Sequence, residues 1–168
     1  MDSVDRVLEQ WAAERPDVDA SPMGVVGRVQ RASRLLDRGL RDGFSAHGLA
    51  LWEFDILATL RRSGPPYRLT AGELVASSMV TSGAITNRVD RLWQRRLVAR
   101  DIDPDNRRSV LITLTEQGRE VVDAALVDHV ANESRLLSAL SPEEQAQLAA
   151  LLRKLLTDLG DRPPDREV

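Results

Sequence analysis

Apolar residues recur every three or four positions through most of this chain, which is the period of an amphipathic helix. The first such stretch has its apolar residues at Val4, Val7, Leu8 and Trp11. The pair Ser21-Pro22 then suits the start of a second helix, because proline is favoured in the first turn. The pattern predicts long helices over residues 2–14, 21–47, 51–62, 115–140 and 141–159.

The middle of the chain carries two shorter helical segments separated by a turn. Thr70 and Glu73 have the spacing of a capping box and open the first of them. Thr81 or Ser82 caps the second, which runs through about Arg95 and is basic. Two short helices split by a turn form a helix-turn-helix pattern, although the same arrangement also occurs in helical domains that bind no DNA.

A β-rich pattern follows directly after the basic helix. The runs 97–100 and 109–115 flank a polar loop that contains proline and asparagine, which predicts a hairpin. A hairpin in this place is a wing, and its tip carries Arg107 and Arg108, which suit the minor groove. The fold class predicted is mainly α with a small β-wing, a winged helix-turn-helix.

The helical period divides the basic helix into two faces. Ile85, Val89 and Leu92 share one side and are expected in the core. The predicted DNA-facing residues are Ser82, Gly83, Thr86, Asn87, Arg91 and Gln94. The helix N-terminus offers free N–H groups to a phosphate, whereas arginine and glutamine side chains suit guanine and adenine edges.

Arg88 belongs to neither face. It lies at the margin of the buried side, about 70° from its centre. An arginine in this position needs a carboxylate or an anionic ligand beside it, so a partly buried salt bridge is the simplest interpretation.

The domain organisation follows from these elements. The predicted parts are N-terminal helices over 1–48, a winged DNA-binding lobe over 49–114, C-terminal dimerisation helices over 115–160 and a polar tail over 161–168. The N-terminal part adds an extra helix to a dimerisation helix. The long helices carry more apolar surface than the small winged lobe can cover, which predicts an obligate homodimer with a helical dimerisation lobe. A compact monomeric bundle is the alternative.

The amino-acid composition excludes several kinds of functional site. The 168 residues contain no cysteine, so disulfides, thiolate metal sites and cysteine nucleophiles are excluded. His47 and His129 are far apart in sequence and are expected to be structural. No catalytic residue, metal site, cofactor or enzyme activity is predicted. The chain has no apolar run long enough to span a membrane and no signal peptide, which predicts a cytoplasmic protein without membrane contact.

The net charge is −3, but basic residues are concentrated in the winged segment. Residues 81–110 carry seven arginines against four aspartates. A local basic surface of this kind favours double-stranded DNA as a partner.

The chain resembles the MarR family of winged-helix transcriptional regulators over nearly its full length, and residues 69–123 carry the match. Its most specific part is "RRSVLITLTEQGRE", which combines the wing tip, the wing strand and the cap of the next helix. The resemblance implies a homodimer with two winged DNA-binding lobes. In this family the wing usually reads Asp-x-Arg, with the aspartate bracing the arginine. Here Asn106 stands in that place before Arg107 and Arg108, so Asp103 or Asp105 is expected to substitute.

The chain is also similar to the urate-responsive subgroup of this family at four positions. The resemblance implies a ligand site made of Trp11, Asp55, Arg88 and Arg100. Guanidinium groups would clamp a planar anion, a carboxylate would orient it and an indole would pack against it. The small-molecule effector expected is urate or a related purine. The alternatives are a different small anion in the same pocket, a phenolic compound as the effector, or a purely structural network.

The function predicted is a ligand-responsive transcriptional regulator, a repressor that binds a pseudo-palindromic operator as a dimer. The alternative of a different class is a helical dimer that acts through protein interaction and has lost DNA binding. Only Asn106 supports that alternative, and the retained Arg91, Arg107 and Arg108 oppose it.

Overall fold

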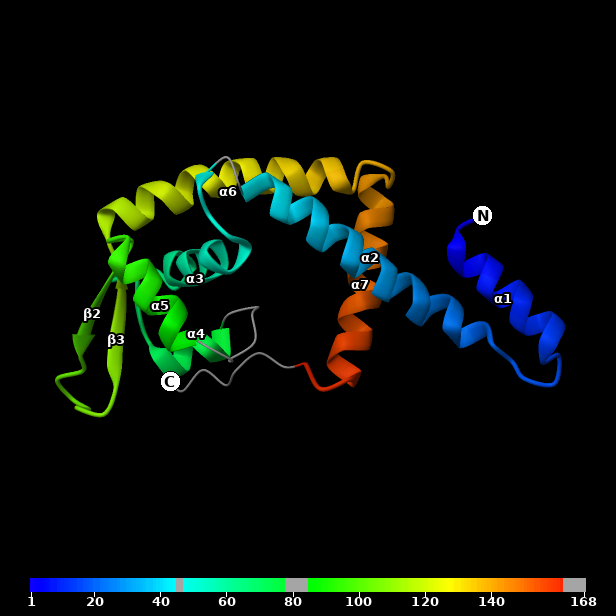
Figure 1. Ribbon diagram of the computed structural model, residues 1–168, viewed down its shortest axis with the longest axis horizontal. Helices are drawn as coiled ribbons and strands as arrows, with labels where there is room; N and C mark the ends of the chain where they lie inside the picture. The colour runs from blue at the N-terminus through cyan, green and yellow to red at the C-terminus, as the bar shows by residue number, and fades with distance from the viewer. Residues whose placement is uncertain (45–46, 78–84, 162–168) are drawn as a thin grey trace. The chain divides into compact units, whose positions relative to one another are not determined.

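The computed structural model describes residues 1–44, 47–77 and 85–161 (Figure 1). It divides into two compact units, Met1–Asp42 and Gly43–Val168. None of the described helices is both long and apolar enough to cross a membrane.

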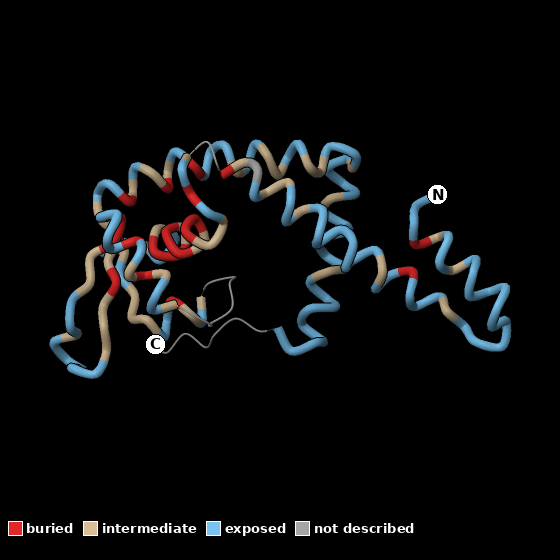
Figure 2. The backbone as a smooth tube through the Cα atoms, in the orientation of Figure 1, coloured by how far each residue is buried: buried red, intermediate tan, exposed pale blue. Residues whose placement is uncertain are grey.

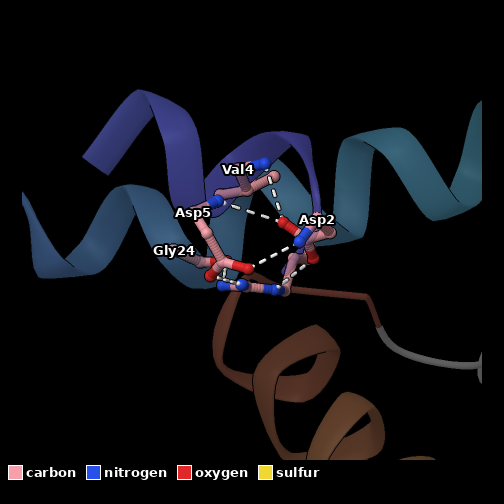
Figure 3. Close-up of polar contacts among 5 residues, drawn as sticks. Asp2, Val4, Asp5 and Gly24 are labelled. Carbon is pink, nitrogen blue, oxygen red and sulfur yellow. Dashed lines mark hydrogen bonds and ion pairs between the residues drawn. The ribbon is translucent and has the colours of Figure 1, made fainter. Parts of the chain in front are cut away.

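The N-terminal unit is a pair of helices, α1 (Ser3–Glu14) and α2, which spans Ser21–Phe44 and continues into the second unit. The Asp2 carboxylate caps α1 by accepting the Val4 and Asp5 N–H groups at 2.7 and 3.1 Å (Figure 3). The Asp5 carboxylate accepts the Asp2 N–H at 2.6 Å, which completes a capping box. Arg28 of α2 pairs with both carboxylates and so ties the start of α1 to α2.

The C-terminal unit holds the remaining elements in the order helix, strand, two helices, two strands and two helices. They are α3 (Leu51–Arg62), β1 (Arg68–Thr70), α4 (Ala71–Ser77), α5 (Ile85–Gln94), β2 (Val98–Ile102), β3 (Val110–Leu114), α6 (Glu116–Leu136) and α7 (Pro142–Asp158). The strands form an antiparallel sheet in the order β1-β3-β2. Leu69 of β1 and Arg100 of β2 both pair with Ile112 of β3, and the β2–β3 hairpin projects beside α5 (Figure 1).

The core of this unit gathers where α3, α5, the sheet and the adjoining part of α6 meet (Figure 2). Ile56, Leu57, Leu60, Leu74 and Leu92 are fully buried in it. Burying side chains of this size contributes about 1.5–3 kcal/mol each, so this cluster holds α5 against α3 and the sheet.

Gly118 lets α6 pass close to the sheet. A Cβ atom at this position would collide with the Leu97 carbonyl oxygen and lie 2.9 Å from Leu114 Cδ1. Thr115 caps the helix by accepting the Gly118 N–H at 3.0 Å. The start of α6 is therefore fixed directly to the root of the wing.

The rest of α6 and α7 leave large apolar side chains exposed within this unit. No residue of α7 is buried. The exposed apolar residues of the two helices are Leu126, Val127, Val130, Leu148, Leu151, Leu155 and Leu156. Isolated exposed leucines are ordinary, but a run of them along two helices is typical of a protein–protein interaction surface.

The predicted fold class is confirmed: the chain is mainly helical with a small β-wing. The helix predicted over 51–62 is confirmed as α3, whereas α2 (Ser21–Phe44) and α6 (Glu116–Leu136) are shorter than the predicted 21–47 and 115–140. The strand β1 was not predicted, since three residues are too short for an alternating pattern to be recognised. Most of the predicted polar tail lies outside the described residues.

Candidate nucleic-acid interface

The helix α5 presents its polar side to solvent because its apolar side is used in the core. Val89 and Leu92 are 3% and 0% exposed. The predicted DNA-facing residues that the structure describes, Thr86, Asn87, Arg91 and Gln94, are all exposed. Ser82 and Gly83 lie outside the described residues. The helical period therefore assigned the two faces correctly, while contact with DNA stays a prediction.

The tip of the wing is shaped by side chains that accept backbone N–H groups. The Asn106 side chain accepts the Arg108 N–H at 3.2 Å, and Asp103 accepts the Asp105 N–H at 3.0 Å. Arg107 and Arg108 are exposed. Asn106 thus braces the backbone of the turn, a task for which an amide oxygen suffices, and both arginines are presented at the tip.

The C-terminal end of α5 is anchored by Arg95. Its Nη1 donates to the Glu53 carboxylate at 2.7 Å and its Nη2 to the Gly48 carbonyl at 3.1 Å. The Glu53 side chain is only 6% exposed, and its second oxygen accepts the Ala50 N–H at the start of α3. A buried carboxylate needs such partners, so Arg95 is a structural residue.

Arg96 ends the helix in the left-handed conformation, with φ at 59°. The Arg96 N–H bonds to the Trp93 carbonyl at 2.8 Å and the Leu97 N–H to the Leu92 carbonyl at 3.0 Å. This is a Schellman ending, in which glycine is the usual residue. The side chain of Arg96 remains exposed next to the predicted DNA-facing surface.

One edge of α5 lies against Trp52 of α3. The guanidinium carbon of Arg91 is 5.0 Å from the centre of the indole ring, and that of Arg88 is 5.7 Å from it. Both are within the range of a cation–π interaction. The Arg88 Nη1 is excluded from solvent and has no hydrogen-bond partner among the residues described.

The other edge of α5 faces the wing. Arg100 of β2 forms an ion pair with Asp90 of α5. Arg100 also lines a small pocket of about 80 Å³ together with Thr86, Val89 and Val110. Because Asp90 is two residues beyond Arg88, the two side chains leave the helix about 200° apart. Arg100 therefore neutralises an acidic residue of α5 on the side away from Trp52.

The predicted ligand residues are thus distributed over several places. Asp55 is half-buried on α3, one helical turn from Trp52 and so on the same side of that helix. Arg88 approaches the same indole, whereas Arg100 is paired with Asp90. Trp11 belongs to the N-terminal unit, where it is 43% exposed. The ligand site stays a prediction.

Trp52 and the Asp90–Arg100 pair were missed from the sequence. The i, i+3 spacing of Trp52 and Asp55 was a usable signal that the two share a helix face. Nothing local in the sequence links Asp90 to Arg100, because the pair depends on how the wing packs on α5.

The two histidines have structural surroundings. The His129 ring lies between Phe44 and Phe54, at centroid distances of 5.0 and 4.7 Å. His47 Nε2 lies 2.7 Å from the Asp128 carboxylate. Within the described ranges no cluster of three or more metal-ligating side chains occurs.

The family model that the chain matches is that of the MarR family, over residues 49–110. Over 152 residues the chain is 42% identical to the HTH-type transcriptional regulator PecS of Dickeya dadantii, covering 90% of this chain and 92% of PecS. The fold is similar to that of BpsR of Bordetella bronchiseptica, from a study of how 6-hydroxynicotinic acid regulates its DNA binding. The TM-score is 0.70 at 26% identity, covering 78% of this chain and 91% of that one.

A second solved structure is that of a mutant MarR from E. coli in complex with operator DNA. Its TM-score is 0.70 at 27% identity, covering 80% of this chain and 94% of that one. The similarity to both structures extends well beyond the winged segment.

Proposed function

The chain belongs to the MarR family, and from that premise we propose that it is a transcriptional repressor that binds a pseudo-palindromic operator as a homodimer. Its relatives are named as transcriptional regulators, a family that is not enzymatic. The observation that carries the proposal is α5, whose apolar face is buried while Arg91, Gln94 and Asn87 remain exposed beside a wing tipped with arginine.

Dimer formation is supported by the apolar surface that each unit leaves exposed. In the C-terminal unit this surface follows α6 and α7, and α2 carries exposed valines of its own at Val25, Val26 and Val29. A two-fold dimer presents two copies of α5 and thus fits a DNA site made of two inverted halves.

In the proposed complex α5 enters the major groove and the wing reaches the minor groove. Arg91 and Gln94 contact base edges, and Arg107 or Arg108 enters the minor groove. The remaining polar contacts go to phosphates and position the protein without reading sequence.

The test is binding to the DNA upstream of the protein's own gene, searched for an inverted repeat. We expect the affinity to fall steeply with salt, because phosphate contacts release counterions. Arg91→Ala should weaken binding about tenfold to a hundredfold and relax one base position. Arg107→Ala should weaken binding to all sequences alike and reduce the salt slope by about one.

Arg15→Ala is the matched control, since Arg15 is an exposed arginine paired with Asp17 outside the winged segment. Binding that does not depend on salt, or that is equally affected by Arg15→Ala and Arg91→Ala, would favour a protein-interaction dimer instead.

We further propose that a small planar anion, urate or a related purine, binds beside Arg88 and releases the DNA. Support comes from the enclosed Nη1 of Arg88, which has a free donor next to Trp52, and from Asp55 on the same side of α3. BpsR offers a precedent, since a heterocyclic acid regulates its DNA binding. Release of the DNA requires only that the anion binds the DNA-free protein more tightly than the DNA-bound protein, by about 1–3 kcal/mol.

Titration of urate and xanthine against the protein–DNA complex tests the effector. Release at submillimolar urate is expected for the wild type, and Arg88→Ala should lose the response. No release at millimolar concentrations rules out urate, and an intact response in Arg88→Ala rules out the site. Trp11→Phe and Arg100→Ala test the two other ligand residues that the sequence predicted.

A further inference from the structure

The indole ring of Trp52 contacts two arginines of α5. Arg88 and Arg91 are three residues apart on α5, and both guanidinium groups approach the indole of Trp52, at 5.7 and 5.0 Å from its centre. Two cations on one ring interact with each other as well as with the ring, because like charges at this range repel.

The two arginines face different surroundings. Arg88 is half-buried and its Nη1 is enclosed without a hydrogen-bond partner among the described residues. Arg91 is exposed, on the polar side of α5. The ring of Trp52 therefore joins an inner arginine, suited to a small anion, to an outer arginine, suited to DNA.

We propose that Trp52 is a positioning residue that orients Arg91 for DNA and makes that orientation depend on the charge beside it at Arg88. The inference rests on the proposed function and names how the site is regulated. In the structure both guanidinium groups lie near the ring, and repulsion between them limits how closely Arg91 packs on it. An anion that neutralises Arg88 removes this repulsion, so Arg91 packs more closely on the indole than the 5.0 Å seen here and moves away from the orientation that suits the groove.

The positioning role is tested by a double-mutant cycle on operator affinity. Trp52→Leu should weaken binding about two- to fivefold, the effect of one cation–π contact. It should also reduce discrimination at the base position that Arg91→Ala relaxes, and at no other. In the Arg91→Ala background Trp52→Leu should cause no further loss.

Trp52→Phe is the conservative control, because it keeps an aromatic face and should recover most of the affinity. An equal loss with and without Arg91, or a loss of discrimination at every base position, would show that Trp52 only supports the fold and would overturn the proposal. The Phe variant keeps the test valid if Trp52→Leu does not fold.

The dependence on Arg88 is tested without any effector. Arg88→Gln removes the inner charge and should lower operator affinity when Trp52 is present, but not in Trp52→Leu. The same fall in both backgrounds contradicts the coupling. Urate titration then shows whether the natural anion acts through the same route.

A fluorescence experiment separates failure of this inference from failure of the proposed function, because it needs no DNA. In a protein carrying Trp11→Phe and Trp93→Phe, Trp52 is the only indole. Acrylamide quenching of the Trp52 fluorescence should change on Arg88→Gln, and the change should differ between the protein with Arg91 and the Arg91→Ala variant. Additive changes overturn the coupling, whereas absent DNA binding with non-additive changes overturns only the proposed function.

Discussion

Trp52 and Glu53, neighbours at the start of α3, contact α5 in different ways. Glu53 binds Arg95 through a buried carboxylate, whose two oxygens accept from Arg95 Nη1 and from the Ala50 N–H. Trp52 receives Arg88 and Arg91 on its ring, and one nitrogen of Arg88 lacks a partner in the described part of the chain. Both carboxylate oxygens of Glu53 thus have a hydrogen-bond donor, whereas one nitrogen of Arg88 has no acceptor among the described residues.

The ion pair at Glu53 and the cation–π contacts at Trp52 differ in how firmly they hold an arginine. An ion pair with a buried carboxylate has one favourable geometry, and breaking it leaves a charge in the core. A cation–π contact is weaker and less directional, so an arginine can leave the ring at small cost. The Glu53 contact thus fixes the position of α5, while the Trp52 contact allows its arginines to change partners.

The largest effect expected is on stability. Arg95→Met removes the partner of the buried Glu53 and should lower the free energy of unfolding by about 2 kcal/mol, since hydrogen bonds to charged groups contribute that much. Arg88→Met, the matched change at Trp52, should be neutral or stabilising, because it removes an enclosed donor without a described partner. Urea denaturation measures both. Equal destabilisation by the two variants would show that the Glu53 and Trp52 contacts do not differ in their contribution to stability.

A smaller effect is expected at the wing side of α5, where Arg100 pairs with Asp90. The side chains are 32% and 40% exposed, so the pair contributes at most about 1 kcal/mol to stability. Its larger role is to mask a negative charge near DNA: Arg100→Ala should weaken operator binding about fivefold, and adding Asp90→Asn should restore it. Mobility-shift titrations at fixed salt measure this.

The effector response of the double variant decides between two roles for Arg100. Release by urate that persists in Asp90→Asn/Arg100→Ala limits Arg100 to masking Asp90. Loss of release with DNA binding intact assigns Arg100 to the ligand site that the family resemblance implies.

The sequence predicted what depends on local pattern. The faces of α5, the wing and the capping box of Thr70 and Glu73 follow from periodicity and spacing, and the structure confirms each. The partners of the arginines could not be predicted in this way. Whether an arginine meets Trp52, Glu53 or Asp90 depends on how α3 and the wing pack against α5, and these residues are 10 to 42 positions away from their partners in the sequence.

A modest gain in stability is expected from Arg96→Gly. Arg96 occupies the left-handed position of the helix ending at a φ of 59°, which glycine adopts without steric cost, so the substitution should stabilise the fold by about 0.5 kcal/mol. If the exposed side chain contacts a phosphate, the same variant weakens DNA binding and lowers the salt slope by about one. Thermal unfolding and salt-dependent binding measure the two effects. A stabilised variant with unchanged binding excludes Arg96 from the interface and confines the role of this helix end to Arg95.

The smallest effect concerns an arginine contact that is complete but exposed, the cluster of Arg28 with Asp2 and Asp5. The pKa of Asp2 is lowered from 3.8 chiefly by the Asp5 N–H, and that of Asp5 chiefly by the Asp2 N–H, with Arg28 lowering both. Because the folded-state pKa values lie below the unfolded ones, this stabilisation is fully present above the unfolded value and is lost as the pH falls through the folded values. NMR titration of the two carboxylates should therefore give midpoints below 3.8, and Arg28→Met should raise both midpoints without returning them to that value, because the backbone N–H donors remain. Midpoints that do not move in Arg28→Met would show that the cap alone holds these carboxylates, and a complete set of partners would then matter only where, as at Glu53, the carboxylate is buried.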